Sequence, residues 1–198
     1  VNDGKSLLHW ALEQGYTCEV KLLIKYGANV NVIYSAGYSV LQRAIAKGLD
    51  ECVDALIGAG ANVGQQTNDK YKLAALHLAV LGGKNCYVSA LLKAGANVDV
   101  VDAREYTALH YAAEKGLPKL VETLIGAGAN LDLQNNVGKS TALHLATEGG
   151  NYECTSALIK GGADMHILDA RGRTALALMA EGTSDYDEGL ETEACKVQ

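Results

Sequence analysis

One pattern of apolar and polar positions recurs six times along the chain. Each copy is a six-residue phrase that begins with a small residue, usually Ser or Thr, and continues with mostly apolar residues; in four of the six copies the fourth position is a histidine, as in TALHLA at residues 141–146. We call the fourth position of each phrase the marker. The markers lie at 9, 42, 77, 110, 144 and 177, so they are 33, 35, 33, 34 and 33 residues apart. Chance does not produce this spacing, which indicates repeated structural units.

Each unit contains two further signals. A glycine lies six residues after each of the first five markers. Gly-Ala-Asn or Gly-Ala-Asp begins eighteen residues after each of the same markers. Ser and Thr cap helix starts and glycine ends helices in the left-handed conformation, so a short first helix is predicted between the phrase and the first glycine. Apolar residues at i, i+3 and i+4, such as Val53, Leu56 and Ile57, predict a second, antiparallel helix. The remaining dozen or so residues favour a hairpin that reaches to the next unit.

These phrases resemble the ankyrin repeat family, which has units of about 33 residues and a Thr-Pro-Leu-His-x-Ala phrase. The resemblance covers residues 1 to about 183. It implies an all-α solenoid of about six stacked helix-turn-helix units joined by β-hairpin loops, within a single domain over residues 1–198. The expected units are approximately 1–33, 34–66, 67–101, 102–134, 135–168 and 169–198, the last being a degenerate cap with an acidic tail. Two markers depart from the family histidine, since Gln42 and Ala177 stand there.

Stacking is expected to supply the stability, because one helix pair is too small to cover its own apolar stripe. Terminal units of such arrays normally have a polar outer face. The first unit instead carries Leu7, Leu8 and Trp10 with no polar cap before them. We therefore expect further repeats before Val1 in the natural protein. No targeting segment is visible at the start of the given chain.

The charge is acidic and unevenly distributed. The chain has 17 basic and 23 acidic residues, for a net charge of −6, and residues 181–198 hold six of the acids and a single base. The absence of a basic stripe disfavours nucleic-acid binding. The densest apolar run, residues 73–81, is under half the length that a membrane crossing needs, so no direct membrane insertion is expected.

Four cysteines follow the repeat. Cys18, Cys52, Cys86 and Cys154 are spaced by 34, 34 and 68 residues and fall at the start of successive second helices. Stacked helices lie about 8–10 Å apart, beyond the roughly 7 Å Cα separation that a disulfide allows. We expect unbridged thiols buried in the core and a cytoplasmic, reducing location, with the nucleus possible as well. Cys195, in the tail, is expected to be exposed.

No candidate for catalysis, cofactor binding or metal binding survives this geometry. The marker histidines occur one per unit, so they cannot converge on one zinc ion, and the resemblance implies that each links its cap residue to neighbouring backbone. The run Gly138-Lys139-Ser140 lacks the earlier glycine of a phosphate loop. Residues 185–189 lack the ligand spacing of a calcium loop.

The hairpins carry the candidate binding residues. In the ankyrin family, partners contact hairpin tips and the exposed side of the first helices, which line a concave face. Tyrosine and arginine are enriched in binding hot spots, and the chain has ten Tyr and no Phe. We predict a row that binds a protein partner with acidic or extended segments, the alternative being that these are ordinary solvated hairpin residues. The row comprises Tyr34, Tyr38, Tyr71, Arg104, Tyr106, Lys139, Arg171 and Arg173.

Two hairpins are longer than the others. The step of 35 adds two residues between Gln65 and Lys72, and the step of 34 adds one near Asn135. Insertions in solenoids map to loops on the binding side, so both are secondary candidates for partner contact.

The sequence therefore predicts a non-catalytic protein-interaction module that binds through a preformed surface. The alternative is a targeting or regulatory segment of a larger enzyme or membrane channel whose chemistry lies outside these residues.

Overall fold

The computed structural model describes residues 6–34 and 37–180. The chain divides into two compact parts, each larger than one repeat; from here on we call them unit 1, Val1–Ala108, and unit 2, Leu109–Gln198. The structure is all-helical: the described residues contain no strand, and residues 175–180 form a last helical turn. The helices of unit 1 are α1 (Leu7–Gln14), α2 (Thr17–Lys25), α3 (Val40–Lys47), α4 (Asp50–Gly58), α5 (Ala75–Leu81) and α6 (Asn85–Lys93). α7 (Ala108–Glu114) starts at the boundary, and unit 2 continues with α8 (Pro118–Gly126), α9 (Ala142–Glu148) and α10 (Tyr152–Lys160).

Three of the first helices, α1, α3 and α9, are capped as the sequence predicts, by Ser6, Ser39 and Thr141, whereas Ala74 before α5 makes no side-chain cap hydrogen bond. Before α3, the Ser39 hydroxyl accepts a hydrogen bond from the backbone N–H of Gln42, and the Gln42 side chain accepts one from the N–H of Ser39. This reciprocal pair satisfies two N–H groups that a helix start would otherwise leave without partners. Gly48 then ends α3 with φ of 70°, a left-handed conformation that favours glycine.

The second helices are held by packing. Their cap positions make no side-chain hydrogen bond, but the predicted apolar stripe is buried, as Val53 and Leu56 of α4 show. Burying one such side chain contributes about 1.5–3 kcal/mol. Pro118 is the first residue of α8, where its missing N–H costs nothing.

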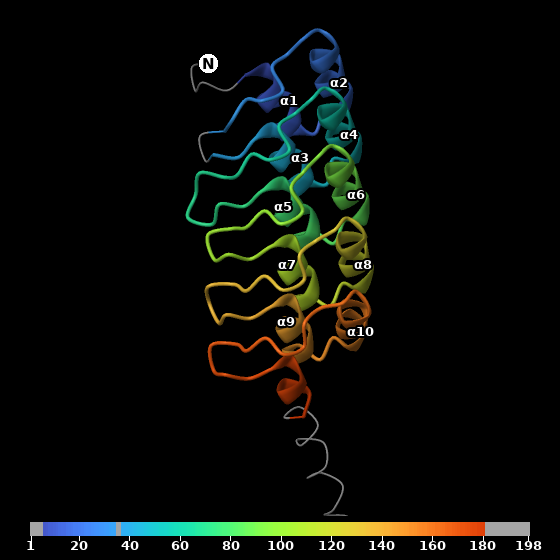
Figure 1. Ribbon diagram of the computed structural model, residues 1–198. Coiled ribbons are helices and arrows are strands. Elements are labelled where there is room, and N and C mark those ends of the chain that lie inside the picture. The colour runs from blue at the N-terminus through green and yellow to red at the C-terminus, as the bar shows by residue number, and fades with distance from the viewer. Residues whose placement is uncertain (1–5, 35–36, 181–198) are drawn as a thin grey trace, which may run out of the picture. The chain divides into compact units, whose positions relative to one another are not determined.

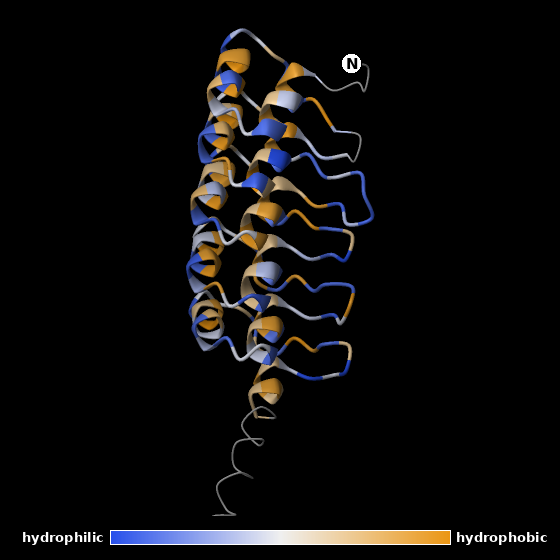
Figure 2. Ribbon diagram, turned by 180° about the vertical axis from the view of Figure 1, so that it is seen from behind, coloured by the Kyte–Doolittle hydropathy of each residue, from blue (hydrophilic) through white to orange (hydrophobic). Residues whose placement is uncertain are grey.

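Each unit has two layers of helices (Figure 1). In unit 1, α3 packs on α1, α4 and α5, while α4 packs on α2 and α6. In unit 2, α10 packs on α8 and α9. Leucines of both layers meet in the core, and the loops that precede the first helices project from the first layer (Figure 2).

These loops double back with little β structure. The described residues contain two isolated bridges, Ile33 with Ser39 and Gln66 with Ala74. Other loops close with one or two backbone hydrogen bonds, such as Asp102 N–H to Tyr106 O at 3.0 Å and Glu105 N–H to Asp102 O at 3.1 Å. Side chains supply many of the remaining hydrogen bonds, so the loops follow a hairpin path without forming strands.

The cysteine prediction is half wrong. Cys52 and Cys154 are buried, whereas Cys18 and Cys86 are exposed. The buried pair lies ten residues after its markers and the exposed pair nine. Since each helical residue turns the chain by about 100°, this offset moves the thiol from the core to the solvent. All four are unbridged, as predicted, while Cys195 lies outside the described residues.

Several other expectations fall outside the described residues. The acidic tail, the degenerate second helix of the last unit and the calcium-like run at 185–189 all lie within residues 181–198. Among residues 6–34 and 37–180, no helix has the length and apolar character to cross a membrane.

Candidate functional site

The marker residues position the loops. His77 is fully buried on α5, and its Nδ1 accepts a hydrogen bond from the backbone N–H of Ala74. Its proton therefore lies on Nε2, which is 3.0 Å from Val100 O and 3.1 Å from Tyr106 O in the next loop. Burial lowers the pKa of His77, so the ring is neutral and acts as a structural link.

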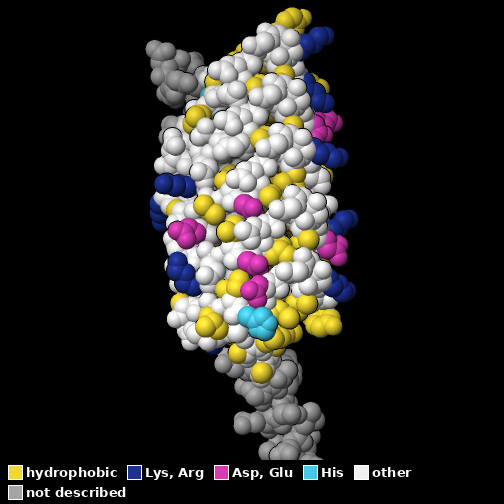
Figure 3. All heavy atoms as spheres, viewed as in Figure 1, with side chains coloured by type: hydrophobic (Ala, Val, Ile, Leu, Met, Phe, Trp, Pro, Cys, Tyr) yellow, Lys and Arg dark blue, Asp and Glu magenta, His cyan; other side chains and the backbone are white. Residues whose placement is uncertain are grey.

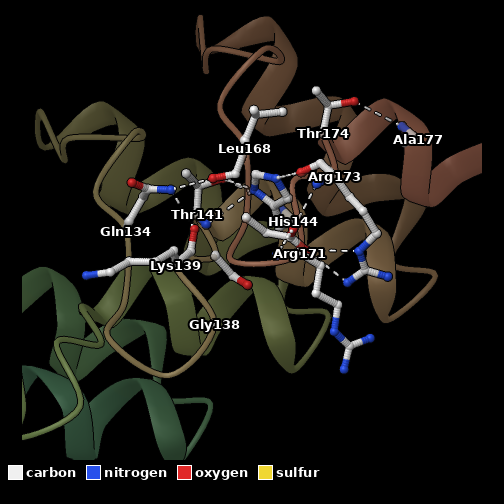
Figure 4. A network of polar contacts seen from close by, with 12 residues as sticks. Gln134, Gly138, Lys139, Thr141, His144, Leu168, Arg171, Arg173, Thr174 and Ala177 are labelled. Carbon is white, nitrogen blue, oxygen red and sulfur yellow. Dashed lines mark hydrogen bonds and ion pairs between the residues drawn. The ribbon is translucent and has the colours of Figure 1, made fainter.

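The same link recurs in unit 2 (Figure 4). The Thr141 hydroxyl lies 2.8 Å from His144 Nδ1, and His144 Nε2 lies 3.1 Å from Arg173 O. The local hydrogen-bonding role implied for these histidines is therefore present in both units.

At the second marker, the side-chain amide of Gln42 makes hydrogen bonds like those that histidine makes at the third and fifth markers. Its Nε2 donates to Gln65 O at 2.8 Å and to Leu73 O at 2.9 Å, while its Oε1 accepts from Ser39 N–H. A glutamine amide, like a neutral imidazole, offers one acceptor and a donor on the far side. The departure from histidine at this marker therefore preserves the link.

Neighbouring loops are also joined directly. Gln66 Nε2 donates to Lys72 O of its own loop and to Val101 O of the next loop, at 2.9 and 2.7 Å. Gln134 donates to Lys139 O and Leu168 O in the same way, and Figure 4 shows the amide between the two loops of unit 2. Such ties hold the loop surfaces in place before any partner binds.

The longer loop at residues 65–73 closes with two side chains. Asp69 Oδ1 accepts hydrogen bonds from the Thr67 hydroxyl and from the N–H groups of Tyr71 and Lys72, while Thr67 accepts one from Leu73 N–H. The hydrogen bond from Thr67 is the largest cause of the lowered pKa of Asp69. The loop lines an open polar hollow of about 550 Å³ together with Asn62.

Two tyrosines of the predicted row are packed against this framework. The Tyr34 ring meets the His9 ring edge-on at 4.2 Å, and burial raises the pKa of Tyr34 to about 12. Tyr38 is half-buried, and its hydroxyl hydrogen-bonds Asp69. Burial first, and the negative charge of Asp69 second, raise the pKa of Tyr38.

Arg43 of α3 forms an ion pair with Glu13 of α1. Its Nε and Nη2 donate to the two carboxylate oxygens of Glu13 at 2.7 and 3.2 Å, and Lys47 Nζ lies 3.1 Å from the same carboxylate. The hydrogen bond from Arg43 is the largest cause that lowers the pKa of Glu13 to about 2.

We call five residues of unit 1 the tyrosine-arginine surface: Tyr34, Tyr38, Arg43, Asp69 and Tyr71. Tyr71 is 49% exposed, and Lys70 Nζ stands 5.0 Å from the centre of its ring. The surface combines aromatic rings with a guanidinium, the composition typical of binding hot spots.

A family model described as ankyrin repeats in three copies matches residues 1–67, 63–135 and 117–187. These matches cover nearly the whole chain. The chain belongs to the ankyrin repeat family. Ankyrin repeats are generally non-catalytic modules that bind other proteins.

Curated relatives of this ankyrin repeat chain are much larger proteins. The E3 ubiquitin-protein ligase KEG of Arabidopsis thaliana is 35% identical over 101 residues, 50% of this chain and 6% of the relative. The palmitoyltransferase AKR1 of Debaryomyces hansenii is 30% identical over 102 residues, 48% of this chain and 12% of the relative. The inactive serine/threonine-protein kinase TEX14 of Bos taurus is 38% identical over 104 residues, 52% of this chain and 7% of the relative.

Two members of the predicted row are turned into the ankyrin framework. Tyr106, expected on the surface, is 6% exposed, with the Arg104 guanidinium 4.6 Å from its ring centre. Arg173 is half-buried and donates to Asp169 through Nε at 3.0 Å and Nη2 at 2.9 Å. Burial alone would raise the pKa of Asp169, but hydrogen bonds from Arg173 and Arg171 outweigh it and leave that pKa lowered.

The other basic members are exposed. Arg104 and Arg171 are exposed on their loops, and Lys139 is exposed at a loop position with φ of 52°. Figure 3 shows Lys and Arg side chains along the hairpin margin of the ankyrin units. The run that contains Lys139 is a turn: Gly138 O accepts from Ala170 N–H, and Ser140 O accepts from Asn135 N–H.

Reasoning from the sequence missed Arg43. It stands one residue after the marker, where other repeats of this chain carry Trp10, Leu78 or Tyr111. A charged residue in an otherwise bulky apolar column was the signal. Among the described residues, no group of three or more potential ligands is placed to hold a metal ion.

Proposed function

We propose that this ankyrin repeat array binds a protein partner through the tyrosine-arginine surface of unit 1. The observations that carry this are the Arg43–Glu13 ion pair, which joins two helices, and the hydrogen bond between Tyr38 and Asp69, which joins two loops. Because these side chains are held before binding, little conformational entropy is lost when a partner docks. Arg43, Lys47, Lys70 and Lys72 outnumber the two carboxylates nearby, which favours a partner with acidic, extended segments.

The predicted row is kept in reduced form. Tyr34, Tyr38 and Tyr71, with Arg104, are proposed contacts in unit 1, and Lys139 and Arg171 are proposed contacts in unit 2. Tyr106 and Arg173 are proposed to support these neighbours from within the loops. The proposed architecture remains six stacked repeats with the boundaries expected from the sequence, joined by hairpin loops and ending in a cap.

Selection from a displayed library of random peptides tests the surface without a known partner. Peptides selected on the wild-type chain should bind the double variant Tyr38→Ala/Tyr71→Ala at least about tenfold more weakly, since hot-spot residues carry most of a binding energy. They should also be rich in Asp and Glu. Tyr152→Ala is the matched control, because this tyrosine is 75% exposed on α10, outside the surface. Equal affinity for the double variant, with an unchanged melting curve, would refute the proposal.

A second proposal is that the array is the recognition segment of a larger protein. The relatives named as a ligase and a palmitoyltransferase support it, because the chain spans 6% and 12% of their lengths. An antibody against this segment that detects, in the source cells, a native protein no larger than these repeats would exclude it.

The proposed location is cytoplasmic, with the nucleus as the alternative. The thiols of Cys52 and Cys154 lie in the core, and a reducing compartment preserves that state. Finding the native protein in a secreted fraction would contradict this location. No nucleic-acid binding is proposed, and retention of the chain on DNA or RNA would contradict that.

A further inference from the structure

The longer loop of unit 1, residues 65–73, precedes α5 and lines the open hollow of about 550 Å³ (Figure 1). Small-molecule pockets are mostly apolar and enclose most of their ligand. An open hollow with polar walls is suited instead to a polar ligand that lies across the surface. The side chains that line it are all polar: Asn62, Gln65, Gln66, Thr67, Asn68, Asp69 and Lys72.

The two glutamines of this loop stand where other loops carry apolar residues. The loop closes with a backbone hydrogen bond from Thr67 N–H to Leu73 O, and four other loops close in the same way. Here the two residues before the closing N–H are Gln65 and Gln66, so loop closure does not require this pair of amides. The corresponding pairs in the other loops are Val32-Ile33, Val100-Val101, Leu133-Gln134 and Ile167-Leu168.

Hydrogen bonds within the chain use only part of these amides. Asn62 accepts Gly64 N–H through Oδ1, and Gln65 donates to Gln66 O through Nε2. Among the described residues, Asn62 Nδ2, Gln65 Oε1 and the amide of Asn68 have no further hydrogen-bond partner. The hollow therefore offers both donors and acceptors to a ligand.

The charges at the hollow balance each other. Asp69 and Lys72 contribute one charge of each sign. Asp69 Oδ1 is already engaged by the Thr67 hydroxyl and by the N–H groups of Tyr71 and Lys72, so this oxygen serves the loop itself. A neutral ligand with donors and acceptors therefore fits better than an ion. The main chain of a peptide offers one N–H and one C=O at each residue other than proline.

The walls of the hollow are fixed before a ligand binds. Gln66 Nε2 ties the loop to Val101 O of the next loop at 2.7 Å, and the Tyr38 hydroxyl hydrogen-bonds Asp69. The loop also lies so close to Gly37 that a Cβ there would be 2.6 Å from Asn68 N. A loop held in this way loses little conformational entropy when a ligand docks.

We infer that this hollow binds the main chain of an extended peptide segment, through hydrogen bonds from the side-chain amides of Asn62, Gln65 and Asn68. Main-chain hydrogen bonds supply affinity in recognition of extended peptides, and neighbouring side-chain contacts supply specificity. Tyr38 adjoins the hollow through Asp69, so one segment can reach both the hollow and the tyrosine-arginine surface. The inference rests on the proposed function and adds that the partner is recognised by its backbone as well as by its acidic side chains.

Ester substitution in a peptide backbone tests this inference. The probe is the tightest-binding peptide selected from the displayed library on the wild-type chain. Replacing one N–H at a time by an ester oxygen removes a donor and weakens the adjacent carbonyl acceptor while keeping every side chain. At one or two positions the ester should weaken binding by about tenfold in isothermal titration calorimetry, because a hydrogen bond to the hollow is lost.

Variants of the hollow show whether that hydrogen bond is made there. Asn62→Ala and Asn68→Ala should each weaken binding of the unmodified peptide by about three- to tenfold, with melting curves like that of the wild type, since both side chains are exposed. In at least one of these variants, the ester at the sensitive position should cost less than about twofold, because its partner is already absent.

Asn97→Ala is the matched control. Asn97 has the same repeat position as Asn62 and accepts Asp99 N–H as Asn62 accepts Gly64 N–H, but it does not line the hollow. This variant should bind the peptide as the wild type does. A loss of affinity equal to that of Asn62→Ala would count against the hollow as the site.

Different results would overturn the two proposals. Ester costs that are the same in the wild type, Asn62→Ala and Asn68→Ala would overturn the main-chain inference alone, provided that Tyr38→Ala/Tyr71→Ala still weakens the peptide. A peptide that binds this tyrosine variant as tightly as the wild type would overturn the proposed function. A library that yields no binding peptide would refute both.

Discussion

The longer loop of unit 1, residues 65–73, and the last loop of unit 2, residues 167–173, reach the same closure with different residues. In unit 2 a single carboxylate, Asp169, accepts the N–H groups of Arg171 and Arg173. In unit 1 the two extra residues separate these roles between Thr67 and Asp69.

The helix side of the link differs in the same way, since Gln42 serves in unit 1 and His144 in unit 2. A repeat therefore conserves the hydrogen bond that must be made, and several side chains can make it.

The largest expected effect comes from removing the marker in either unit. Gln42→Ala and His144→Ala should each lower the free energy of unfolding by about 2–4 kcal/mol, because buried backbone groups lose their partners and a cavity remains. Urea unfolding measures both.

Gln42→His should cost less than about 1.5 kcal/mol, because it restores the donor and acceptor used in unit 2. If Gln42→His proved as damaging as Gln42→Ala, the two markers would not be equivalent.

Loop tips offer a sharper contrast. Gly37 and Gly172 occupy the same repeat position and have φ of 81° and 73°, but a Cβ on Gly37 would lie 2.6 Å from Asn68 N, while one on Gly172 would meet nothing within 4 Å. Gly172→Ala should cost about 1 kcal/mol from backbone strain alone, and Gly37→Ala about 2–3 kcal/mol because the longer loop must also move. Equal losses in thermal melts would show that the longer loop yields freely.

The ion pair between Glu13 and Arg43 should make the free energy of unfolding depend on pH in the acidic range. The pKa of Glu13 is about 2 in the folded chain against 4.5 for an ordinary glutamate, so the pair stabilises the fold above pH 4.5. That contribution, about 1 kcal/mol after solvent screening, should disappear as the pH falls from 4.5 to 2. Glu13→Gln should flatten this part of the profile.

Glu148 is the control for that experiment. It has the same repeat position in unit 2, is exposed and forms no ion pair with the described residues. Glu148→Gln should leave the pH dependence of the free energy of unfolding between pH 4.5 and 2 unchanged. If both variants reduced this pH dependence to a similar extent, the effect would come from net charge.

Thiol labelling compares the opening of the two units. Cys18 and Cys86 should react with a thiol reagent at once, while Cys52 and Cys154 should react only when the chain opens. Burial also raises the pKa of both buried thiols, which slows them further. With the other cysteines changed to Ser, the rate at Cys52 reports on unit 1 and the rate at Cys154 on unit 2. Immediate labelling of either would contradict its burial.

Much of the fold and less of the site could be predicted from the sequence. The helix pairs, the Ser and Thr caps of α1, α3 and α9, and the buried stripes follow from local rules that a 33-residue period repeats, and these are present. The role of Arg43, one residue after the marker, was missed, because the sequence shows that a charge is there but not which carboxylate it pairs with. Tyr106 failed as a surface residue because its burial depends on how Arg104 folds over its ring.

By itself, the sequence determined the family, the helix pairs and their starts and ends, since these depend on residues within a few positions of one another. Only the tertiary structure decided which cysteines are buried, how Gln42 replaces a histidine and which tyrosines reach the surface. These depend on rotations of about 100° per residue and on contacts between residues some 33 positions apart in the chain. A shift of one position leaves the pattern recognisable but moves a side chain from the core to the solvent.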